Sequence, residues 1–306
     1  MTRHLLTLDD LNDNELLEVI NKASDIRQNP NDYRTRLQGQ TLAMIFQKRS
    51  TRTRVSFEVG MYQLGGSALF LGASDIQIGR GESIADTSQV LSRYCDLMMA
   101  RVYAHSDLVE LAENSSVPVI NGLSDALHPC QVLADLQTVN EHFGQMKGLK
   151  MCYVGDGNNM AHSLLIGCSR VGMDIAVVTP EGYEAEASYV EKARENAAKS
   201  GSTVTVTTSV EEGASGAHAV YTDVWASMGQ EEEHKQRLRD FEGYQVDDRT
   251  MAYAESNAIF MHCLPAHRGE EVSASVADGP QSIIFDEAEN RLHAQKSLML
   301  FLKGAL

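Results

Sequence analysis

Apolar and polar positions along this chain follow two alternating patterns. Short apolar runs, such as 41–48 ("TLAMIFQK") and 67–72 ("SALFLG"), predict β-strands. Between such runs apolar side chains recur at helical spacing, as Leu16, Ile20 and Ala23 do. Strands and helices that alternate this regularly are typical of parallel, doubly wound sheets.

The predicted strands are 41–48, 67–72, 96–102, 117–123, 150–157, 173–180, 203–210, 217–225, 258–265 and 282–287. The predicted helices are 11–28, a helix that follows 46–54 and stops at 65–66, 81–95, 105–115, 128–144, one from about 159, 185–201, and a last one through 291–306. Ligands of such sheets bind beyond the carboxyl ends of the strands, so we look for chemistry in the loops there.

The length of 306 residues exceeds one comfortable hydrophobic core, so two domains are expected. The stretch 144–150 ("GQMKGLK") looks like a connector between them. We expect an α/β fold with two doubly wound parallel-sheet domains joined by helices, the C-terminal helix returning to the first domain. The expected domains are 1–145 with about 288–306, and 146–287.

Composition excludes several classes of protein. With 26 Lys and Arg against 42 Asp and Glu, the formal charge is −16, which argues against nucleic-acid binding. Five scattered cysteines without CxxC spacing suit reduced thiols rather than disulfides or a zinc site. The N-terminus turns acidic too early for a signal peptide, and no apolar run is long enough to span a membrane. A cytoplasmic location is expected.

The segment 46–58 ("FQKRSTRTRVSFE") concentrates positive charge and hydroxyls in this acidic chain. These residues are Lys48, Arg49, Ser50, Thr51, Arg52, Thr53 and Arg54. The segment joins a predicted strand to a helix, whose first turn offers free N–H groups to an anion. Guanidinium groups and hydroxyls add hydrogen bonds, which favours phosphate binding over a solvated helix start capped by Ser50 or Thr51. The glycines and Lys of a nucleotide P-loop are missing.

Two other strand ends in the first half carry polar residues. Arg101 closes an apolar strand, although a lone arginine there is usually a surface residue. His128 and Gln131, in "HPCQ", stand where a strand gives way to a helix that starts at a proline. His128 can donate to a carbonyl oxygen and Gln131 can hold an amide, or His128 simply caps the helix; the residues alone leave both open.

The second half has three such loops. In "YVGDGNNMAHS", Gly155 and Gly157 invite a dinucleotide interpretation, but the third glycine is missing, and Asn side chains at a helix start can hold a carboxylate instead. Asp223 ends an apolar strand, where it can orient an amine or cap a helix. Cys263 needs a base and an electropositive setting to act as a nucleophile, so the residues alone favour a buried, inert thiol.

Taken in order, "STRTR", "MMAR", "HPCQ", "GDGNNM", "DVWASMG" and "HCLP" resemble the motifs of the carbamoyltransferase family. The resemblance runs from "TLAMIF" to "RLHAQK", which is nearly the whole chain. It implies that 1–145 with about 288–306 binds carbamoyl phosphate. The pair "DVWASMG" and "HCLP" is more specific and points to members that use ornithine, so 146–287 would bind ornithine.

The resemblance also implies the carbamoyl-phosphate ligands. They are Ser50, Thr51, Arg52, Thr53, Gln77, Arg101, His128, Gln131, Cys263, Leu264 and Arg291. Ser50 to Thr53 would hold the phosphate, with Arg52 as the direct ligand, while Lys48, Arg49 and Arg54 set the surrounding field or pair with carboxylates. Arg101 and His128, with Thr53, would polarise the carbonyl oxygen.

For the rest of this ligand, Gln131 and the backbone of Cys263 and Leu264 would bind the carbamoyl nitrogen, and Arg291 would reach the ligand from near the C-terminus. Gln77 would come from a neighbouring subunit, because family members are homotrimers or multiples of trimers.

On the ornithine side, the implied ligands are Asn159, Asp223, Ser227 and Met228. Asp223 and Cys263 would lie beside the reacting amine, which makes Arg101, His128, Asp223 and Cys263 the implied catalytic residues. The δ-amine would attack the carbamoyl carbon and release phosphate, giving citrulline. No metal or organic cofactor is implied, because the leaving group is already activated.

Three alternatives stay open. A related amine such as putrescine could replace ornithine. An NAD-dependent oxidoreductase would need an acidic residue about 20 positions after the glycines; Glu181 lies nearby, but the six motifs have no role in that interpretation. A binding protein that lost its activity is argued against by the intact Arg52, His128, Asp223 and Cys263.

Overall fold

The computed structural model describes residues 2–72, 81–226 and 233–306, which form two compact units. Unit 1 runs as far as Gln137 and takes in Glu289–Leu306, and unit 2 is Thr138–Ala288. Helices α5 (Pro129–Phe143) and α12 (Ile284–Leu302) each continue from one unit into the other along the chain. Each unit is built on one parallel sheet, so the predicted α/β class is confirmed.

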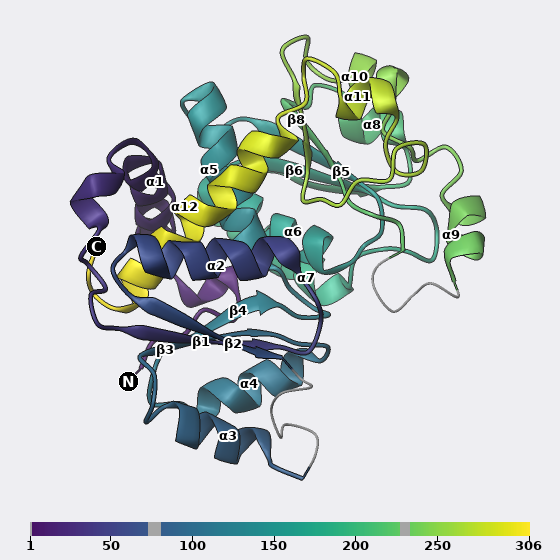
Figure 1. Ribbon diagram of the computed structural model, residues 1–306. Helices are drawn as coiled ribbons and strands as arrows, with labels where there is room; N and C mark the ends of the chain where they lie inside the picture. Colours follow the sequence, from purple (N-terminus) through teal and green to yellow (C-terminus); the bar gives the residue numbers. More distant parts are fainter. Residues whose placement is uncertain (1, 73–80, 227–232) are drawn as a thin grey trace. The chain divides into compact units, whose positions relative to one another are not determined.

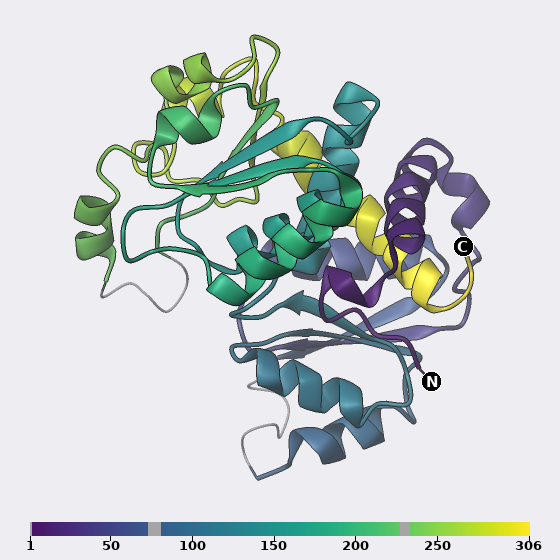
Figure 2. The ribbon, with the colours of Figure 1, turned by 180° about the vertical axis from the view of Figure 1, so that it is seen from behind.

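Unit 1 contains a parallel sheet with the strand order β2-β1-β3-β4. Its strands are β1 (Thr41–Phe46), β2 (Ser67–Gly72), β3 (Leu97–Arg101) and β4 (Val119–Leu123). Its other elements are η1 (Leu8–Asp10), α1 (Asp13–Gln28), η2 (Pro30–Tyr33), α2 (Thr51–Gln63), α3 (Ile84–Leu91) and α4 (His105–Glu113). Helices α3 and α4 cover one face of the sheet, and α2 and α12 lie on the other (Figures 1 and 2). Helices on both faces explain why β1 is an unbroken apolar run, buried from Leu42 to Phe46.

Unit 2 contains a parallel sheet with the order β7-β6-β5-β8-β9. Its strands are β5 (Lys150–Val154), β6 (Asp174–Val178), β7 (Val204–Thr207), β8 (Ala219–Thr222) and β9 (Ile259–His262). Its helices are α6 (Asn159–Val171), α7 (Ala187–Ser200), α8 (Val210–Ala214), α9 (His234–Asp240), α10 (Asp248–Tyr253) and α11 (Ala274–Ala277). The short helices α8, α10 and α11 add Ala214, Met251 and Val276 to the core cluster on one face of the sheet.

The C-terminal helix returns to unit 1, as predicted. The Ser297 hydroxyl donates to the Val19 carbonyl of α1 at 2.7 Å, and the Gln137 amide of α5 donates to Asn290 Oδ1 at 3.1 Å. A Cβ atom on Gly60 of α2 would lie 3.3 Å from the side chain of Lys296, so α2 and α12 pack closely there.

One predicted strand, 282–287, is wrong. Only Ser282 makes an isolated bridge, to Phe260, and α12 begins at Ile284, seven residues before the predicted last helix. Asp286 and Glu287 lie in its first turn, where carboxylates complement the partial positive charge of a helix start. The run "SIIF" is too short to predict a strand by itself, and the acidic residues that follow it favour a helix start.

The strand orders bring the polar loops together within each unit. Strands β1 and β3 are neighbours in unit 1, and strands β5, β8 and β9 are neighbours in unit 2. The chain order reverses between β1 and β3 in unit 1 and between β5 and β8 in unit 2, which is where ligands of doubly wound sheets bind. None of the helices in the described part of the chain has the length and apolar character that crossing a lipid bilayer requires.

Candidate functional site

The basic segment forms the start of α2, directly after β1. Ser50 is the N-cap residue, and its Oγ accepts a hydrogen bond from the Thr53 N–H at 3.2 Å, which confirms one of the two predicted caps. Thr53 is buried, Arg52 is half-buried and Thr51 is exposed. The first turn therefore presents backbone N–H groups, hydroxyls and a guanidinium group at one strand end.

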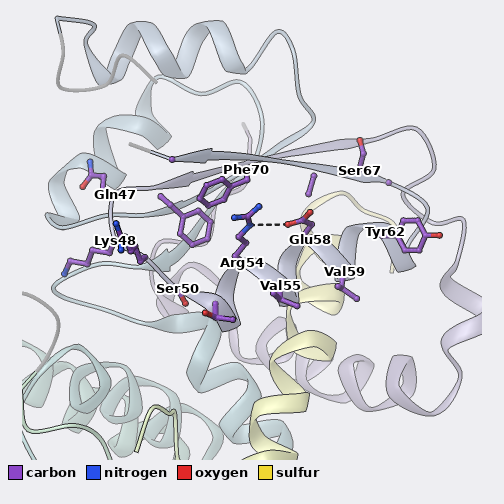
Figure 3. Close-up of a pocket in the computed structure, with 16 residues that line it drawn as sticks. Gln47, Lys48, Ser50, Arg54, Val55, Glu58, Val59, Tyr62, Ser67 and Phe70 are labelled. Carbon is purple, nitrogen blue, oxygen red and sulfur yellow. Dashed lines mark hydrogen bonds and ion pairs between the residues drawn. The ribbon is translucent and has the colours of Figure 1, made fainter. Parts of the chain in front are cut away.

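The neighbouring cations have other contacts. The Arg54 guanidinium lies over the Phe70 ring, 3.9 Å from its centroid, and Arg54 Nε is 3.5 Å from Glu58 Oε2 (Figure 3). The predicted pairing with a carboxylate is thus confirmed for Arg54. Lys48 Nζ lies 4.7 Å from the ring centroid of Tyr103, and burial, together with the charge of Arg101, lowers the pKa of Lys48.

Arg291 connects three elements of unit 1. It is 3 % exposed, and its guanidinium donates to Gln131 Oε1 at 2.6 Å and to Thr53 Oγ1 at 3.3 Å. The Gln131 amide nitrogen in turn donates to Asp135 Oδ1 at 2.8 Å. Three residues that the motifs placed far apart in sequence thus meet beside the start of α2.

His128 lies among three cations of this group. It is 5 % exposed, and burial lowers its pKa well below the ordinary range, with Arg291, Arg101 and Arg52 adding to the effect. Arg101 reaches the same place because β3 pairs with β1, and its carbonyl accepts a hydrogen bond from Gln47 N at 2.9 Å. A neutral imidazole among three guanidinium groups can donate a hydrogen bond without itself changing charge at neutral pH.

In unit 2, the ends of β8 and β9 place Asp223 next to Cys263. Thr222 and His262 are paired in the sheet, so the residues that follow them leave the two strands side by side. The Cys263 thiol donates to Asp223 Oδ1 at 3.0 Å, and the same oxygen accepts from Val224 N at 2.8 Å. Cys263 is half-buried whereas the other four cysteines are buried, so the interpretation of a buried thiol is wrong.

The segment after β9 has an unusual backbone. Leu264 has a φ of 60°, a left-handed conformation that non-glycine residues rarely adopt and that clusters at functional sites. Its N–H donates to His262 Nδ1 at 2.8 Å, and His262 Nε2 lies 3.2 Å from Glu271 Oε1. Donor atoms of Asp223, His262 and Cys263 lie within 4.8 Å of one another, a set that can hold a metal ion.

The loop after β5 holds Asn159 at the first turn of α6. Its neighbour Asn158 caps the helix, accepting from Met160 N at 2.9 Å. A Cβ atom on Gly157 would lie 2.2 Å from Ala185 N, so this glycine allows the chain's own 183–185 segment to approach. In a dinucleotide site that space admits the pyrophosphate, so this packing argues against the oxidoreductase interpretation.

Sequence reasoning missed Arg237, which is buried on α9. Its Nη1 donates to Asp156 Oδ2 at 2.7 Å and to the Trp225 carbonyl at 2.8 Å, and its guanidinium carbon lies 5.0 Å from the Tyr183 ring centroid. Arg237 therefore connects the turn between β5 and α6 to the loop after β8. The sequence separation of 81 residues between Arg237 and Asp156 left no local signal for this pair.

Three predicted ligands, Gln77, Ser227 and Met228, lie outside the described residues. Of the others, the structure brings Thr53, Gln131 and Arg291 into direct contact, with Arg52, Arg101 and His128 in electrostatic contact, all in unit 1. Asp223 and Cys263 are in contact in unit 2.

Unit 1 offers polar groups that suit an anion, and unit 2 offers a carboxylate beside a thiol. Comparison with known proteins shows that these two sets belong to a class of transferases. Residues 3–141 match the family model "Aspartate/ornithine carbamoyltransferase, carbamoyl-P binding domain", and residues 147–302 match the "Asp/Orn binding domain" of the same family. The chain belongs to the aspartate/ornithine carbamoyltransferase family.

Within that family the chain is similar to ornithine carbamoyltransferases. It is 53 % identical to the enzyme of Oceanobacillus iheyensis over 302 residues, which cover 98 % of this chain and 94 % of the relative. It is 52 % identical to the enzyme of Caldicellulosiruptor saccharolyticus, covering 98 % of both chains. The solved structure of ornithine carbamoyltransferase from Pyrococcus furiosus superposes with a TM-score of 0.96 at 50 % identity, covering 100 % of this chain and 98 % of that one.

Proposed function

We propose that the chain transfers the carbamoyl group of carbamoyl phosphate to the δ-amine of L-ornithine, giving L-citrulline and phosphate. The observation that carries this proposal is the neutral, buried His128 among Arg52, Arg101 and Arg291. An anionic phosphoryl group needs the cations, and a carbonyl oxygen that gains negative charge needs a fixed hydrogen-bond donor beside them.

In unit 1 the proposed ligands of the phosphate are Ser50, Thr51, Arg52 and Thr53, at the start of α2. Arg101 and His128 act on the carbonyl oxygen. Gln131 binds the carbamoyl nitrogen through Oε1, since an amide oxygen has two lone pairs and Arg291 uses one of them. The domain that binds carbamoyl phosphate is proposed to be 1–145 with about 288–306.

In unit 2 the proposed ligands of ornithine are Asn159 and Asp223, with Ser227 and Met228, and the proposed domain is 146–287. Asp223 and Cys263 orient the amine and accept or relay its proton. The backbone of Cys263 and Leu264 is assigned to the carbamoyl group. The amine nitrogen forms a bond to the carbamoyl carbon, the bond from that carbon to the phosphate oxygen breaks, and the amine loses one proton.

A citrulline-forming assay with carbamoyl phosphate tests this function. Ornithine, putrescine and aspartate are offered separately as the amine. We expect turnover with ornithine and at least about a hundredfold lower kcat/KM with the other two. Putrescine lacks the α-carboxylate that a site built to bind polar groups would hold, and aspartate has a carboxylate where ornithine has its δ-amine. Equal or better turnover with putrescine would replace the proposed substrate.

The pH profile of the same reaction tests the proton chemistry. Only the neutral amine can attack, so kcat/KM for ornithine should rise from neutral toward alkaline pH. His128 should add no titration at the pH of about 6.5 that is ordinary for a histidine, because burial lowers its pKa well below that value. A profile that falls through neutral pH would contradict both statements.

We also propose that the chain assembles as a homotrimer or a multiple of trimers. The support is an apolar surface on β2 and α2: Leu69 is 53 %, Val55 51 % and Tyr62 80 % exposed. Strand β2 is an edge of its sheet, and a pocket of about 1230 Å³ lies between it and α2 (Figure 3). Exposed edges and apolar patches of this kind suit a second copy of the chain.

Light scattering coupled to size-exclusion chromatography measures the assembly. The expected mass is a multiple of three chains, and Val55→Asp with Leu69→Lys should reduce it to one chain. A monomeric wild-type chain would contradict the proposal. A cytoplasmic location is likewise a proposal, supported by five free cysteine thiols.

A further inference from the structure

We propose that His267, Glu270 and Glu271, with His234 as a fourth ligand, form a binding site for a divalent transition-metal ion such as Zn²⁺ in unit 2. Donor atoms of His267, Glu270 and Glu271 lie within 4.8 Å of one another. His267 Nδ1 is 3.9 Å from Glu270 Oε2 and 3.8 Å from Glu271 Oε2, and His234 Nε2 is 3.0 Å from Glu270 Oε2. Ligands bound to zinc at about 2.0–2.2 Å lie roughly 3.3 Å apart, so small movements suffice.

A tight turn of the backbone, from His267 to Glu270, brings these donors close together. Glu270 N donates to the His267 carbonyl at 2.9 Å, and Gly269, the third residue of the turn, has a φ of 95°. A glycine at that position is what a type II turn requires. Hydrogen bonds from Gln245 Nε2 to the Glu270 carbonyl (2.7 Å) and from Val246 N to the Glu271 carbonyl (2.9 Å) attach the turn to the rest of unit 2.

A buried carboxylate points independently to a cation. Glu271 is 0 % exposed, and its Oε1 accepts from His262 Nε2 and His267 N. Its Oε2 has no hydrogen-bond partner among the described residues, and lies on the side of His267 Nδ1. A buried carboxylate is strongly destabilising unless a cation compensates it.

The permanent cations of the described chain do not supply that compensation. No Lys or Arg of the described ranges forms an ion pair with Glu270 or Glu271. Arg268, the residue between His267 and Gly269, is directed to Asp278 instead, at 2.6 and 2.8 Å. Two carboxylates and two imidazoles match the nitrogen and oxygen ligands that zinc accepts.

Calorimetric titration of the full chain with Zn²⁺ tests the site. It is done in a Cys263→Ser background, because the thiol beside Asp223 and His262 can bind the same ion. We expect about one equivalent of zinc in Cys263→Ser. Adding His267→Ala and Glu270→Gln to this background should weaken the affinity for zinc about a hundredfold. The matched control, His142→Ala with Glu242→Gln, removes the same residue types from exposed positions and should leave binding unchanged.

If Cys263→Ser alone abolishes zinc binding, the site is overturned. It is also overturned if the test pair (His267→Ala with Glu270→Gln) and the control pair (His142→Ala with Glu242→Gln) weaken zinc binding to the same extent. A second measurement needs no substitution of the ligands: Co²⁺ bound to the Cys263→Ser chain should give visible absorption typical of tetrahedral nitrogen and oxygen ligation. No such spectrum with Co²⁺ in excess would also contradict the proposal. Neither measurement depends on carbamoyl transfer, so the proposed function can fail independently.

Discussion

The two halves of the proposed chemistry are built from opposite kinds of residues. In unit 1, Arg52, Arg101 and Arg291 surround a neutral His128; His128 and Arg291 are buried, and Arg52 and Arg101 are half-buried. In unit 2, a carboxylate, Asp223, accepts a hydrogen bond from the half-buried Cys263 at the ends of two short strands. An anion with a developing negative charge suits the first arrangement and a cationic amine suits the second. The two sites should therefore respond separately to substitution.

The largest expected effect is on the anion site. Arg52→Ala removes the proposed phosphate ligand, and we expect kcat/KM for carbamoyl phosphate to fall about a thousandfold, with a raised KM and a lower kcat. Steady-state kinetics with saturating ornithine measures it. Arg49→Ala is the matched control, since Arg49 is an exposed arginine of the same basic segment, and it should change kcat/KM by less than about threefold. Similar losses of kcat/KM in both variants would show that Arg52 acts only through its general positive charge and does not bind the phosphate directly.

The next effect should appear on the amine site. Asp223→Asn keeps the shape but removes the charge beside Cys263 Sγ, and kcat/KM for ornithine should fall about a hundredfold or more. Rates measured with ornithine varied at saturating carbamoyl phosphate give this value. An unchanged kcat/KM for ornithine would show that Asp223 does not bind the amine, and would contradict the assignment of the amine site to unit 2.

A smaller effect is expected at Arg237, which contacts no proposed ligand group but connects two loops of unit 2. Arg237→Ala leaves the half-buried Asp156 carboxylate without its ion pair, and desolvation already raises the pKa of that carboxyl. We expect the KM for ornithine to rise about tenfold while the KM for carbamoyl phosphate stays constant. Arg239→Ala, on the exposed side of the same helix, is the control and should be neutral. Equal changes in both KM values would indicate a general loss of structure.

The smallest effect concerns stability and comes from another buried cation of unit 1. Lys296 is 2 % exposed, and burial lowers its pKa to about 8. Between pH 8 and about 10.4, Lys296 is protonated in the unfolded chain and neutral in the folded chain. The contribution of Lys296 to the wild-type free energy of unfolding should therefore increase as the pH rises through this range. Lys296→Met should therefore add about 1–3 kcal/mol at pH 7 and much less at pH 9.5.

Urea denaturation of both chains at the two pH values measures this difference. In the difference between the two free energies of unfolding, the contributions of groups that titrate alike in both chains cancel. A destabilised Lys296→Met chain at pH 7 would show that the hydrogen bond from Lys296 to Gln63 outweighs the desolvation of the charge.

The sequence predicted unit 1 better than unit 2, for physical reasons. The chemistry of the basic segment is local: cap, hydroxyls and Arg52 follow one another, so the spacing alone favoured phosphate. Nine of the ten predicted strands are present, because short runs of apolar and β-branched residues are read directly from the chain. The strand at 282–287 failed because three consecutive apolar residues, Ile283 to Phe285, fit a strand and a helix start equally well.

The contacts of unit 2 depend on residues far apart in the chain. The pairing of Asp223 with Cys263 requires the register of β8 with β9, and the prediction that Cys263 is buried was wrong because its exposure depends on tertiary structure rather than on its neighbours in sequence. Arg237 could not be found at all, since its partner Asp156 lies in another loop. Helices α8, α9, α10 and α11 were also missed, because none is longer than seven residues and a periodic pattern needs more turns.

The most direct test of the division between the two sites is calorimetric binding of carbamoyl phosphate without ornithine, at low temperature, to wild type, Arg52→Ala and Asp223→Asn. We predict that Asp223→Asn binds carbamoyl phosphate within about twofold of wild type, while Arg52→Ala binds it at least about a hundredfold more weakly. Strong binding by Arg52→Ala, or its loss in Asp223→Asn, would contradict the assignment of the anion to unit 1 and the amine to unit 2.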